Sequence, residues 1–201
     1  MRNVFVKFFD ILFPPSPDAR LVRTLTLENM NKNYSLHHIN GVVTLSQFQN
    51  PVIRALIHEA KFHGSRRAYL LLSMLLDIYL NETTQKYDAI IPIPLSAVRM
   101  RERGYNQVFE IIRQNKSARD IGIKHKTLTR TRHTQPQTSL DKEQRQKNLF
   151  DAFSVTLPET ITKKHILLID DVVTTGTTLH TAKAELLRYS PKAITCLALA
   201  H

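Results

Sequence analysis

The sequence predicts an α/β fold in which an open, mostly parallel sheet is flanked by helices. Short apolar segments alternate with segments of helical periodicity from residue 51 onward, and the strands among them are apolar on both faces. Strands of this kind are buried on both sides and are typical of parallel sheets. The chain has 201 residues, 42% of them hydrophobic, which is enough to bury the core of one domain with a small appendage.

Residues 1–50 are expected to form that appendage. Phenylalanine and leucine side chains at helical spacing predict a short amphipathic helix over residues 2–13, which is ended by the prolines that follow. Strand-like fragments come next, at 20–27 and 41–45. The polar face of the expected helix has no stripe of Lys and Arg, which favours docking onto the protein or a partner over binding to a membrane surface.

Residues 51–201 are expected to form the α/β domain. A helix begins at Pro51, where proline fits the first turn, and Gly64 interrupts the pattern. Residues 124–148 are highly polar and are expected to form a loop that leads into a helical turn. The other expected helices cover 66–80, 104–114 and 177–189, and the expected strands cover 88–94, 165–170 and 193–200.

Charge and composition narrow the function classes. The net charge is +11, from 28 Lys and Arg against 17 Asp and Glu, and it favours anionic partners: phosphorylated metabolites, nucleic acid or a membrane surface. Cys196 is the single cysteine, which excludes an internal disulfide and a cysteine-built zinc site. No apolar stretch reaches the roughly 20 residues that span a membrane. The N-terminus does not match a signal peptide, so a cytoplasmic location is expected.

Residues 166–179, ILLIDDVVTTGTTL, carry most of the recognisable chemistry. An apolar strand ends in Asp170 and Asp171, and a small-residue turn then opens a helix. Ligands bind at the carboxyl ends of parallel strands, and a helix N-terminus directs backbone N–H groups and a positive dipole at one spot. Gly176 lets the backbone approach a ligand closely, and the threonine hydroxyls add donors. The turn therefore predicts a phosphate site.

The two carboxylates beside this turn need a different partner, because they would repel a phosphate. A ribose 2′,3′-diol together with Mg²⁺ meets that condition, since ionised carboxylates only accept hydrogen bonds. The alternative is that Asp170 and Asp171 merely cap a helix. Two acids, two apolar residues and Thr-Thr-Gly-Thr-Thr directly after a four-residue apolar strand fit that alternative poorly.

Residues 166–178 resemble the thirteen-residue signature with which type I phosphoribosyltransferases bind phosphoribosyl pyrophosphate (PRPP). The resemblance implies the type I phosphoribosyltransferase fold, with two acids on the ribose hydroxyls, a turn around the 5′-phosphate, and Mg²⁺ shared with the ligand. The residues expected to bind ribose and phosphate are Asp170, Asp171, Val172, Val173, Thr174, Thr175, Gly176, Thr177 and Thr178.

The wider pattern resembles the ComF family, phosphoribosyltransferase-like proteins linked to bacterial DNA uptake and gluconate-associated operons. The similarity is carried by 51–64, 88–107, 130–153 and 166–179, in the family's order, and includes Arg-Gly-Tyr-Asn-Gln at 103–107. ComF proteins commonly begin with a four-cysteine zinc module after a Leu-Phe-Pro-Pro-like segment. Here that segment stands without a nearby cysteine, and the adjacent His37 and His38 diverge too much to rebuild the module, so no zinc is expected.

Two further segments are expected to face the pyrophosphate of PRPP, whose charge calls for arginine forks and Mg²⁺. The first follows the strand at 88–94 and has a solvent-facing basic helix start as its alternative; its candidates are Arg99, Arg101, Arg103, Gly104, Asn106 and Gln107. The second is the polar stretch 128–148, which would close as a flexible lid or be an ordinary loop; its candidates are Arg130, Thr134, Gln137, Arg145 and Asn148. Lys61 and Phe62 resemble a family motif that contacts a ligand or packs on the surface.

Three functions stay open. The first is an Mg²⁺-dependent phosphoribosyltransferase, for which no single catalytic residue stands out because positioning and charge stabilisation suffice. The second is a binding module that senses PRPP or a nucleotide without turnover and engages nucleic acid or a DNA-uptake helicase; the sequence ends at His201, where an acceptor-binding hood would follow. The third, a single-stranded nucleic-acid binder, lacks the stacking aromatics that such grooves use between residues 124 and 147.

Overall fold

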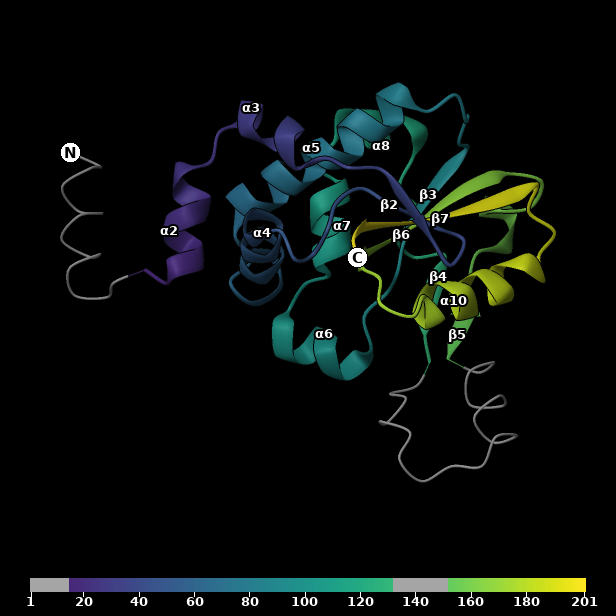
Figure 1. Ribbon diagram of the computed structural model, residues 1–201. Helices are drawn as coiled ribbons and strands as arrows, with labels where there is room; N and C mark the ends of the chain where they lie inside the picture. The colour runs from purple at the N-terminus through teal and green to yellow at the C-terminus, as the bar shows by residue number, and fades with distance from the viewer. Residues whose placement is uncertain (1–14, 132–151) are drawn as a thin grey trace.

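A mixed sheet organises the computed structural model, which describes residues 15–131 and 152–201. Five strands of this part of the chain pair in the order β1-β2-β7-β6-β3 (Figure 1). The pairings β2–β7, β7–β6 and β6–β3 are parallel, and β1 runs antiparallel at the edge. The strands are β1 (His37–Ile39), β2 (Val42–Thr44), β3 (Ala89–Pro92), β6 (His165–Val172) and β7 (Ala193–Ala200). The predicted open, mostly parallel α/β fold is therefore confirmed.

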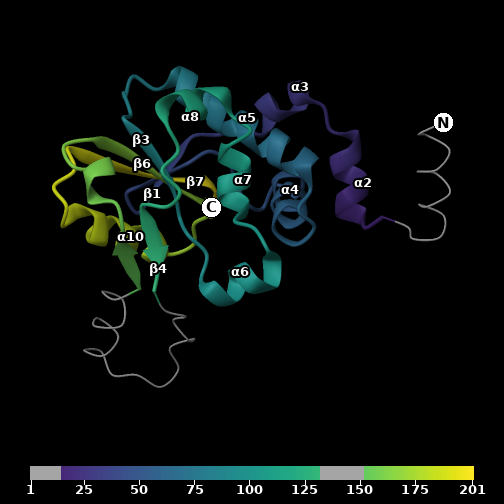
Figure 2. The same cartoon turned by 180° about the vertical axis from the view of Figure 1, so that it is seen from behind.

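Helices cover both faces of the sheet (Figures 1 and 2). The helices on the larger face bury one core with the sheet, and α10 with a β4–β5 hairpin buries the other. The elements of the larger face and its margins are α2 (Pro17–Thr24), α3 (Leu27–Met30), η1 (Asn31–Asn33), α4 (Pro51–Phe62), α5 (Arg66–Glu82), α6 (Ala97–Arg103), α7 (Gln107–Ile112) and α8 (Lys116–Ile121). Those of the smaller face are β4 (Leu128–Arg130), β5 (Phe153–Val155), η2 (Pro158–Thr160) and α10 (Thr177–Leu187).

Strand β6 contributes alternate side chains to the two cores. Leu167 and Ile169 pack with α4, α5 and α7, whereas Ile166 and Leu168 pack with α10 and β5. Because side chains alternate along a strand, the two acids that follow continue this division. Asp171 falls on the α4–α7 face and Asp170 on the α10 face, at the carboxyl end of the strand.

The N-terminal part differs from expectation in one element. The fragment at 20–27, predicted as strand-like, is wrong: α2 begins at Pro17 and runs through most of it. Ser16 accepts a hydrogen bond from the backbone N–H of Ala19, proline occupies the first turn, and Asp18 adds an acid near the helix N-terminus. Together these form a complete helix start that outweighs a short β-rich sequence.

The sheet continues across the boundary expected at residue 50. The predicted strand at 41–45 is confirmed as β2. It pairs with β1 on one side and with β7 on the other. The helix predicted at 2–13 lies outside the described residues. Among residues 15–131 and 152–201, no helix combines the length and the apolar character that a membrane crossing needs. The cytoplasmic location stays a prediction.

The middle of the chain holds more regular structure than predicted. The helix predicted at 104–114 is shorter, α7, and a separate helix, α6, precedes it, because Gly104 ends α6 in the left-handed conformation (φ +79°) and Asn106 caps α7. The polar stretch from residue 124 contains the strand β4, which pairs with β5. The other predicted helices and strands of 51–201 lie where they were expected.

Candidate functional site

The candidate site lies at the carboxyl ends of β3 and β6, where the sequence places its acids. A small hollow of about 40 Å³ is lined by Asp170 and by the loop and first turn at 172–179. A larger cleft of about 470 Å³ is lined by both acids and by residues of α4, α6, α7 and β4. Asp170, Val172 and Thr178 line both cavities, so the hollow and the cleft adjoin.

The loop before α10 has the geometry of an anion cradle. Gly176 occupies the N-cap position with φ +79° and has no side chain to cap the first-turn N–H groups of this eleven-residue helix. The Thr177 N–H makes only a long contact of 3.4 Å with the Thr175 hydroxyl, so the first turn and the helix dipole still suit an anion. The backbone angle favours glycine at 176, and a Cβ there would lie 2.9 Å from Nε2 of His180, so that ring would have to shift.

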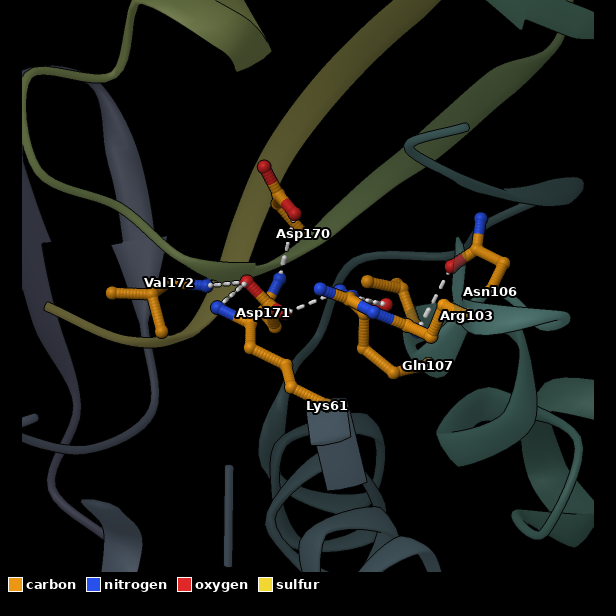
Figure 3. A network of polar contacts seen from close by, with 8 residues as sticks. Lys61, Arg103, Asn106, Gln107, Asp170, Asp171 and Val172 are labelled. Atoms are coloured by element: carbon orange, nitrogen blue, oxygen red, sulfur yellow. Dashed lines mark hydrogen bonds and ion pairs between the residues drawn. The ribbon is translucent and has the colours of Figure 1, made fainter. Parts of the chain in front are cut away.

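Asp171 is almost fully buried and is surrounded by donors. Nζ of Lys61 lies 3.1 Å from its Oδ1, and Nε2 of Gln107 donates to its Oδ2 over 2.6 Å (Figure 3). The backbone N–H of Val172 also donates to Oδ1, at 2.7 Å. These contacts come from α4, α7 and the strand itself, so the carboxylate ties three elements together. A buried carboxylate with a cation and two N–H donors is well satisfied.

Asp170 has a less favourable environment. Burial and the charge of Asp171 raise its pKa to about 7, against the lowering effects of a hydrogen bond from the backbone N–H of Asp171 and of the cations Lys61 and Arg130. The two acids are consecutive, and Figure 3 shows them directed to opposite sides of the strand. Asp170 therefore holds a proton near neutral pH more readily than an ordinary carboxyl, and a cation or hydroxyl donors at this spot would stabilise its ionised form.

Arg103 extends the network outward from Asp171. Its Nη1 donates to Oε1 of Gln107 over 2.5 Å, and Gln107 in turn donates to Asp171. The Arg103 guanidinium also lies over the ring of Phe62, 5.6 Å from its centre. Phe62 is 63% exposed and lines the cleft, so its ring is accessible from there.

The residues predicted for the pyrophosphate side separate into two groups. Arg99, Arg103 and Gln107 line the large cleft with both acids. Arg101 is exposed and is not among the cleft residues. Gly104 and Asn106 shape the chain instead: Gly104 ends α6, and Asn106 caps α7 while its Nδ2 donates to the carbonyl of Ile93 over 2.8 Å.

The loop predicted as a lid is described only at its start. Arg130, at the end of β4, lines the cleft, and burial together with the neighbouring Arg99 guanidinium lowers its pKa. The charge of Asp170 acts in the opposite direction, so the arginine and the acid attract each other. Thr134, Gln137, Arg145 and Asn148 lie outside the described residues.

Metal-binding groups occur at two places in the described residues. Asp170 and Asp171 offer carboxylate oxygens, but the described residues around them supply no third acidic or imidazole ligand, so a cation there would share its coordination with a bound ligand. The one group of three is His58, Glu59 and His63 on and just after α4, whose ligand atoms lie within 4.8 Å of one another. Nδ1 of His58 lies 3.1 Å from Oδ2 of Asp18, so one member of this group already has a partner.

Lys61 is the residue of the site that sequence analysis placed least firmly. It lies 110 positions before Asp171, so no local spacing links them. The Lys-Phe pair after an amphipathic helix was its only signal, and the structure puts both side chains at the cleft. Ile93, Pro94, Leu95 and Val108 add an apolar wall to the cleft, a role that the sequence did not predict for them.

Comparisons with known proteins agree with this geometry. Residues 68–201 match the model of the phosphoribosyl transferase domain. The chain belongs to the phosphoribosyl transferase domain family. Within it, the named relatives are competence and DNA-utilization proteins, and the ComF-family resemblance is confirmed.

Three of these ComF-family relatives show the extent of the similarity. DNA utilization protein YhgH of Escherichia coli strain K12 is 32% identical over 158 residues, which are 76% of this chain and 68% of that protein. Competence protein F of Haemophilus influenzae is 37% identical over 94 residues, 46% of this chain and 41% of its own length. Competence protein ComFC of Streptococcus pneumoniae is 30% identical over 139 residues, 67% of this chain and 56% of that protein. The chain thus spans less than two thirds of some relatives that it matches.

Solved structures overlap with this phosphoribosyl transferase domain only in part. The glutamine PRPP amidotransferase from B. subtilis, complexed with ADP and GMP, has 13% identity and a TM-score of 0.47 over 70% of this chain and 30% of that one. A hypoxanthine phosphoribosyltransferase from Staphylococcus aureus has 15% identity and a TM-score of 0.37 over 67% and 63%. At these scores the overlaps carry no weight, and the family assignment rests on the sequence matches.

Proposed function

We propose that this ComF-family chain binds PRPP together with Mg²⁺ and transfers its phosphoribosyl group to an acceptor with a planar ring. The observation that carries the proposal is the meeting of an acid pair, an anion cradle and a set of cations in two adjoining cavities at one edge of the sheet. Each matches one part of PRPP: the ribose diol, the 5′-phosphate and the pyrophosphate.

The phosphate and ribose ends are assigned from the loop and the acids. The N–H groups of the 174–178 turn and the threonine hydroxyls bind the 5′-phosphate. The carboxylates of Asp170 and Asp171 accept hydrogen bonds from the 2′- and 3′-hydroxyls. To do so, Asp171 exchanges its contact with Lys61 for the ligand, and the freed ammonium group then lies beside the cleft that receives the pyrophosphate.

The transfer breaks the bond between C1 of the ribose and the pyrophosphate oxygen, and that oxygen keeps the bonding electron pair. A lone pair of the acceptor forms the new bond to C1, and the acceptor releases its proton to solvent. Arg99, Arg103 and Lys61 neutralise the charge that develops on the leaving group, which is the main demand of this chemistry. Asp170 and Asp171 are the residues that would hold Mg²⁺ together with the ligand, and the ion would supply further positive charge for the leaving group.

Phe62 and its surroundings support an acceptor with a planar ring. The exposed phenylalanine ring and the Arg103 guanidinium over it offer a stacking surface next to the acids. The apolar wall formed by Ile93, Pro94, Leu95 and Val108 lines the same cleft as Phe62 and Arg103. Relatives named for competence and DNA utilization suggest that the acceptor derives from incoming DNA, as a base, a nucleotide or a single strand.

A second candidate is a module that binds PRPP or a nucleotide without turnover and engages nucleic acid or a DNA-uptake helicase. The observation in its favour is the ion pair between Lys61 and Asp171. It satisfies the buried acid in the absence of ligand, so ligand binding would exchange one set of contacts for another and could signal occupancy. The exposed Arg101 and the net charge of +11 suit an anionic partner.

Calorimetric titration with PRPP and Mg²⁺ tests the binding common to both candidates. We expect the double variant Asp170→Asn with Asp171→Asn to lose measurable binding, while Asp120→Asn, which changes an exposed acid on α8, leaves it unchanged. Unchanged affinity in the double variant contradicts the proposed site. Release of pyrophosphate across a panel of purine, pyrimidine and pyridine acceptors then separates the two: turnover supports the transferase, and tight binding without turnover supports the sensor.

A further inference from the structure

A second large cavity lies near the amino-terminal ends of β6 and β7, away from the acids at the carboxyl end of β6. Its volume is about 480 Å³, and it is lined by residues of the 34–43 segment, the C-terminal end of α5, the segment after α5, and the starts of β6 and β7. Its lining includes Tyr34, Tyr79, Glu82, Tyr87, His165 and Thr195. None of these residues lines the PRPP cleft, and the size suits a small organic ligand.

Aromatic rings form the walls of this cavity. The hydroxyls of Tyr79 and Tyr87 lie 2.6 Å apart, and the ring of Tyr87 meets that of His165 edge to face at 4.9 Å. His165 is fixed in turn by a contact of 3.1 Å between its Nε2 and the hydroxyl of Thr195. These mutual contacts hold the rings in place before any ligand arrives, and fixed aromatic walls favour a flat ring.

One hydroxyl group in the cavity lacks a well-formed hydrogen bond within the described part of the chain. The hydroxyl of Tyr34 is buried and makes no well-formed hydrogen bond with a described residue, although the Glu82 carboxylate lies near it. Burial and the nearby Glu82 carboxylate raise the pKa of Tyr34 to about 12, so the group stays a neutral hydroxyl that can both donate and accept. A buried hydroxyl without a well-formed hydrogen bond is unfavourable, and a ligand that bonds to it would remove the cost.

The charges around the cavity exclude a phosphate. Glu82 is the charged residue of its described lining, and neither Lys nor Arg is part of it, in a chain whose net charge is +11. Glu82 is also the last residue of the 17-residue helix α5, so the negative end of the helix dipole faces the cavity. Both features repel anions and attract N–H donors, the reverse of the anion cradle at α10.

We propose that this cavity binds an unphosphorylated nucleobase or nucleoside that carries an exocyclic amino group. The ring lies against the tyrosines, the amino group donates to Glu82, and the Tyr34 hydroxyl bonds to a ring nitrogen. The inference does not depend on the proposed function, because it uses none of the residues of the PRPP cleft. The chain would then have a second binding site, for an unphosphorylated base or nucleoside, apart from the site that suits a phosphorylated ribose.

Titration calorimetry with adenosine tests the site directly. We expect Glu82→Gln to weaken adenosine about tenfold, as for the loss of a charged acceptor, and Tyr34→Phe to weaken it about fivefold. Tyr34→Phe should leave the urea midpoint unchanged or higher, because it removes a group that is poorly satisfied in the free protein. The matched controls are Glu159→Gln, on the surface, and Tyr189→Phe, on the other core, and neither should change affinity.

Ligand specificity gives a second test with the unmodified chain. Inosine lacks the amino group and should bind at least fivefold more weakly than adenosine, and AMP should not compete for this cavity. Equal binding of adenosine and inosine would overturn the assignment of Glu82. Binding of choline in place of adenosine would show that the tyrosines and Glu82 form a cation site instead.

Fluorine NMR of the chain labelled with 3-fluorotyrosine locates the binding. The sequence has six tyrosines and no tryptophan, and three of the six line the cavity. Adenosine should shift the signals of Tyr34, Tyr79 and Tyr87, assigned by single Tyr→Phe variants. PRPP with Mg²⁺ should instead shift Tyr105, whose hydroxyl donates to the carbonyl of Lys61, a residue of the PRPP cleft. Adenosine shifts confined to Tyr105, or none at all, overturn the inference, whatever PRPP does.

Discussion

Nζ of Lys61 lies 3.1 Å from Oδ1 of Asp171 and joins the C-terminal end of α4 to the carboxyl end of the central strand β6. The side chain of Asp171 is 7% exposed and that of Lys61 is 25% exposed, so the pair is only partly screened by water. Removal of one partner from such a pair leaves a buried charge without compensation. The contact therefore belongs to the stability of the ligand-free fold as well as to the site.

We expect Lys61→Met to lower the free energy of unfolding by about 1–3 kcal/mol, because the side chain keeps its length but loses the charge that faces Asp171. Urea unfolding of the ligand-free protein measures the loss. Lys86→Met, which changes an exposed lysine, serves as the control and should cost less than about 0.5 kcal/mol. Equal effects of the two substitutions would mean that the ion pair adds nothing to stability.

The raised pKa of Asp170 predicts a pH-dependent stability that Asp170→Asn should remove. The pKa is about 7 in the folded chain, against an ordinary value of 3.8. Between these values the folded state binds more protons than the unfolded state, so this carboxyl makes the protein less stable as pH rises through that window, and the full penalty is present above about pH 7. The amide variant carries no such penalty.

The comparison is made by urea unfolding at pH 5 and pH 8. We expect Asp170→Asn to gain stability relative to the unmodified chain by on the order of 1–3 kcal/mol between the two pH values, after allowance for partial exposure of the acid. Asp120→Asn should show no such change. A constant difference between variant and parent at both pH values would contradict the raised pKa.

Gly176 and Gly104 share φ +79° and differ in their surroundings, which makes them a matched pair. Alanine at either position adopts an unfavourable backbone angle at about 1–2 kcal/mol. At Gly104 the new Cβ meets nothing within 4 Å, whereas at Gly176 it lies 2.9 Å from His180 Nε2. Gly176→Ala should therefore destabilise the protein more and should also weaken PRPP, because the cradle must shift.

The double variant Gly176→Ala with His180→Ala separates the two causes. It should recover the part of the loss that comes from the contact with His180 and leave the part that comes from the backbone. Thermal unfolding gives the stabilities and calorimetry gives the affinities. Indistinguishable losses in Gly104→Ala and Gly176→Ala would show that the imidazole moves aside at no cost.

Phe62 should matter for ring-containing ligands and not for PRPP itself. Phe62→Ala removes a stacking surface worth about 1–3 kcal/mol per base, so single-stranded oligonucleotide or acceptor binding should weaken by at least about fivefold. The control is Leu70→Ala, which truncates an exposed apolar residue on the neighbouring helix α5. Fluorescence anisotropy of a labelled oligonucleotide at fixed salt measures the effect. A parallel loss of PRPP affinity would mean that the ring supports the fold of the cleft.

The sequence was most informative where pattern and chemistry coincide within a few residues. The apolar strand, the acid pair and the turn at 166–179 could be assigned together because each has its own periodicity or residue preference. Pro51 and Gly64 marked the limits of a helix in the same local way. The strand predicted at 20–27 is wrong because Ser16 and Pro17 do more than end a proline-rich segment: they start the helix α2.

Contacts between distant parts of the chain were out of reach for that kind of reasoning. Lys61 meets Asp171 only because α4 packs against the sheet, and no spacing encodes that approach. Asn106 and Gln107 are neighbours in one motif but have different roles: Asn106 caps α7, whereas Gln107 donates to Asp171. The sequence alone does not distinguish these roles. The aromatic cavity could not be predicted, because its tyrosines lie in a loop, a helix and a connection with no shared motif.

The alternation of Asp170 and Asp171 along β6 has a consequence for sequence change in this family. A strand displaced by one residue presents every side chain to the opposite face. A single insertion or deletion between His165 and Asp170 would therefore exchange the neighbours of the two acids and move one of them away from Lys61 and Gln107. Length changes in related chains should accordingly be absent from this strand and collect in the connections on either side of it.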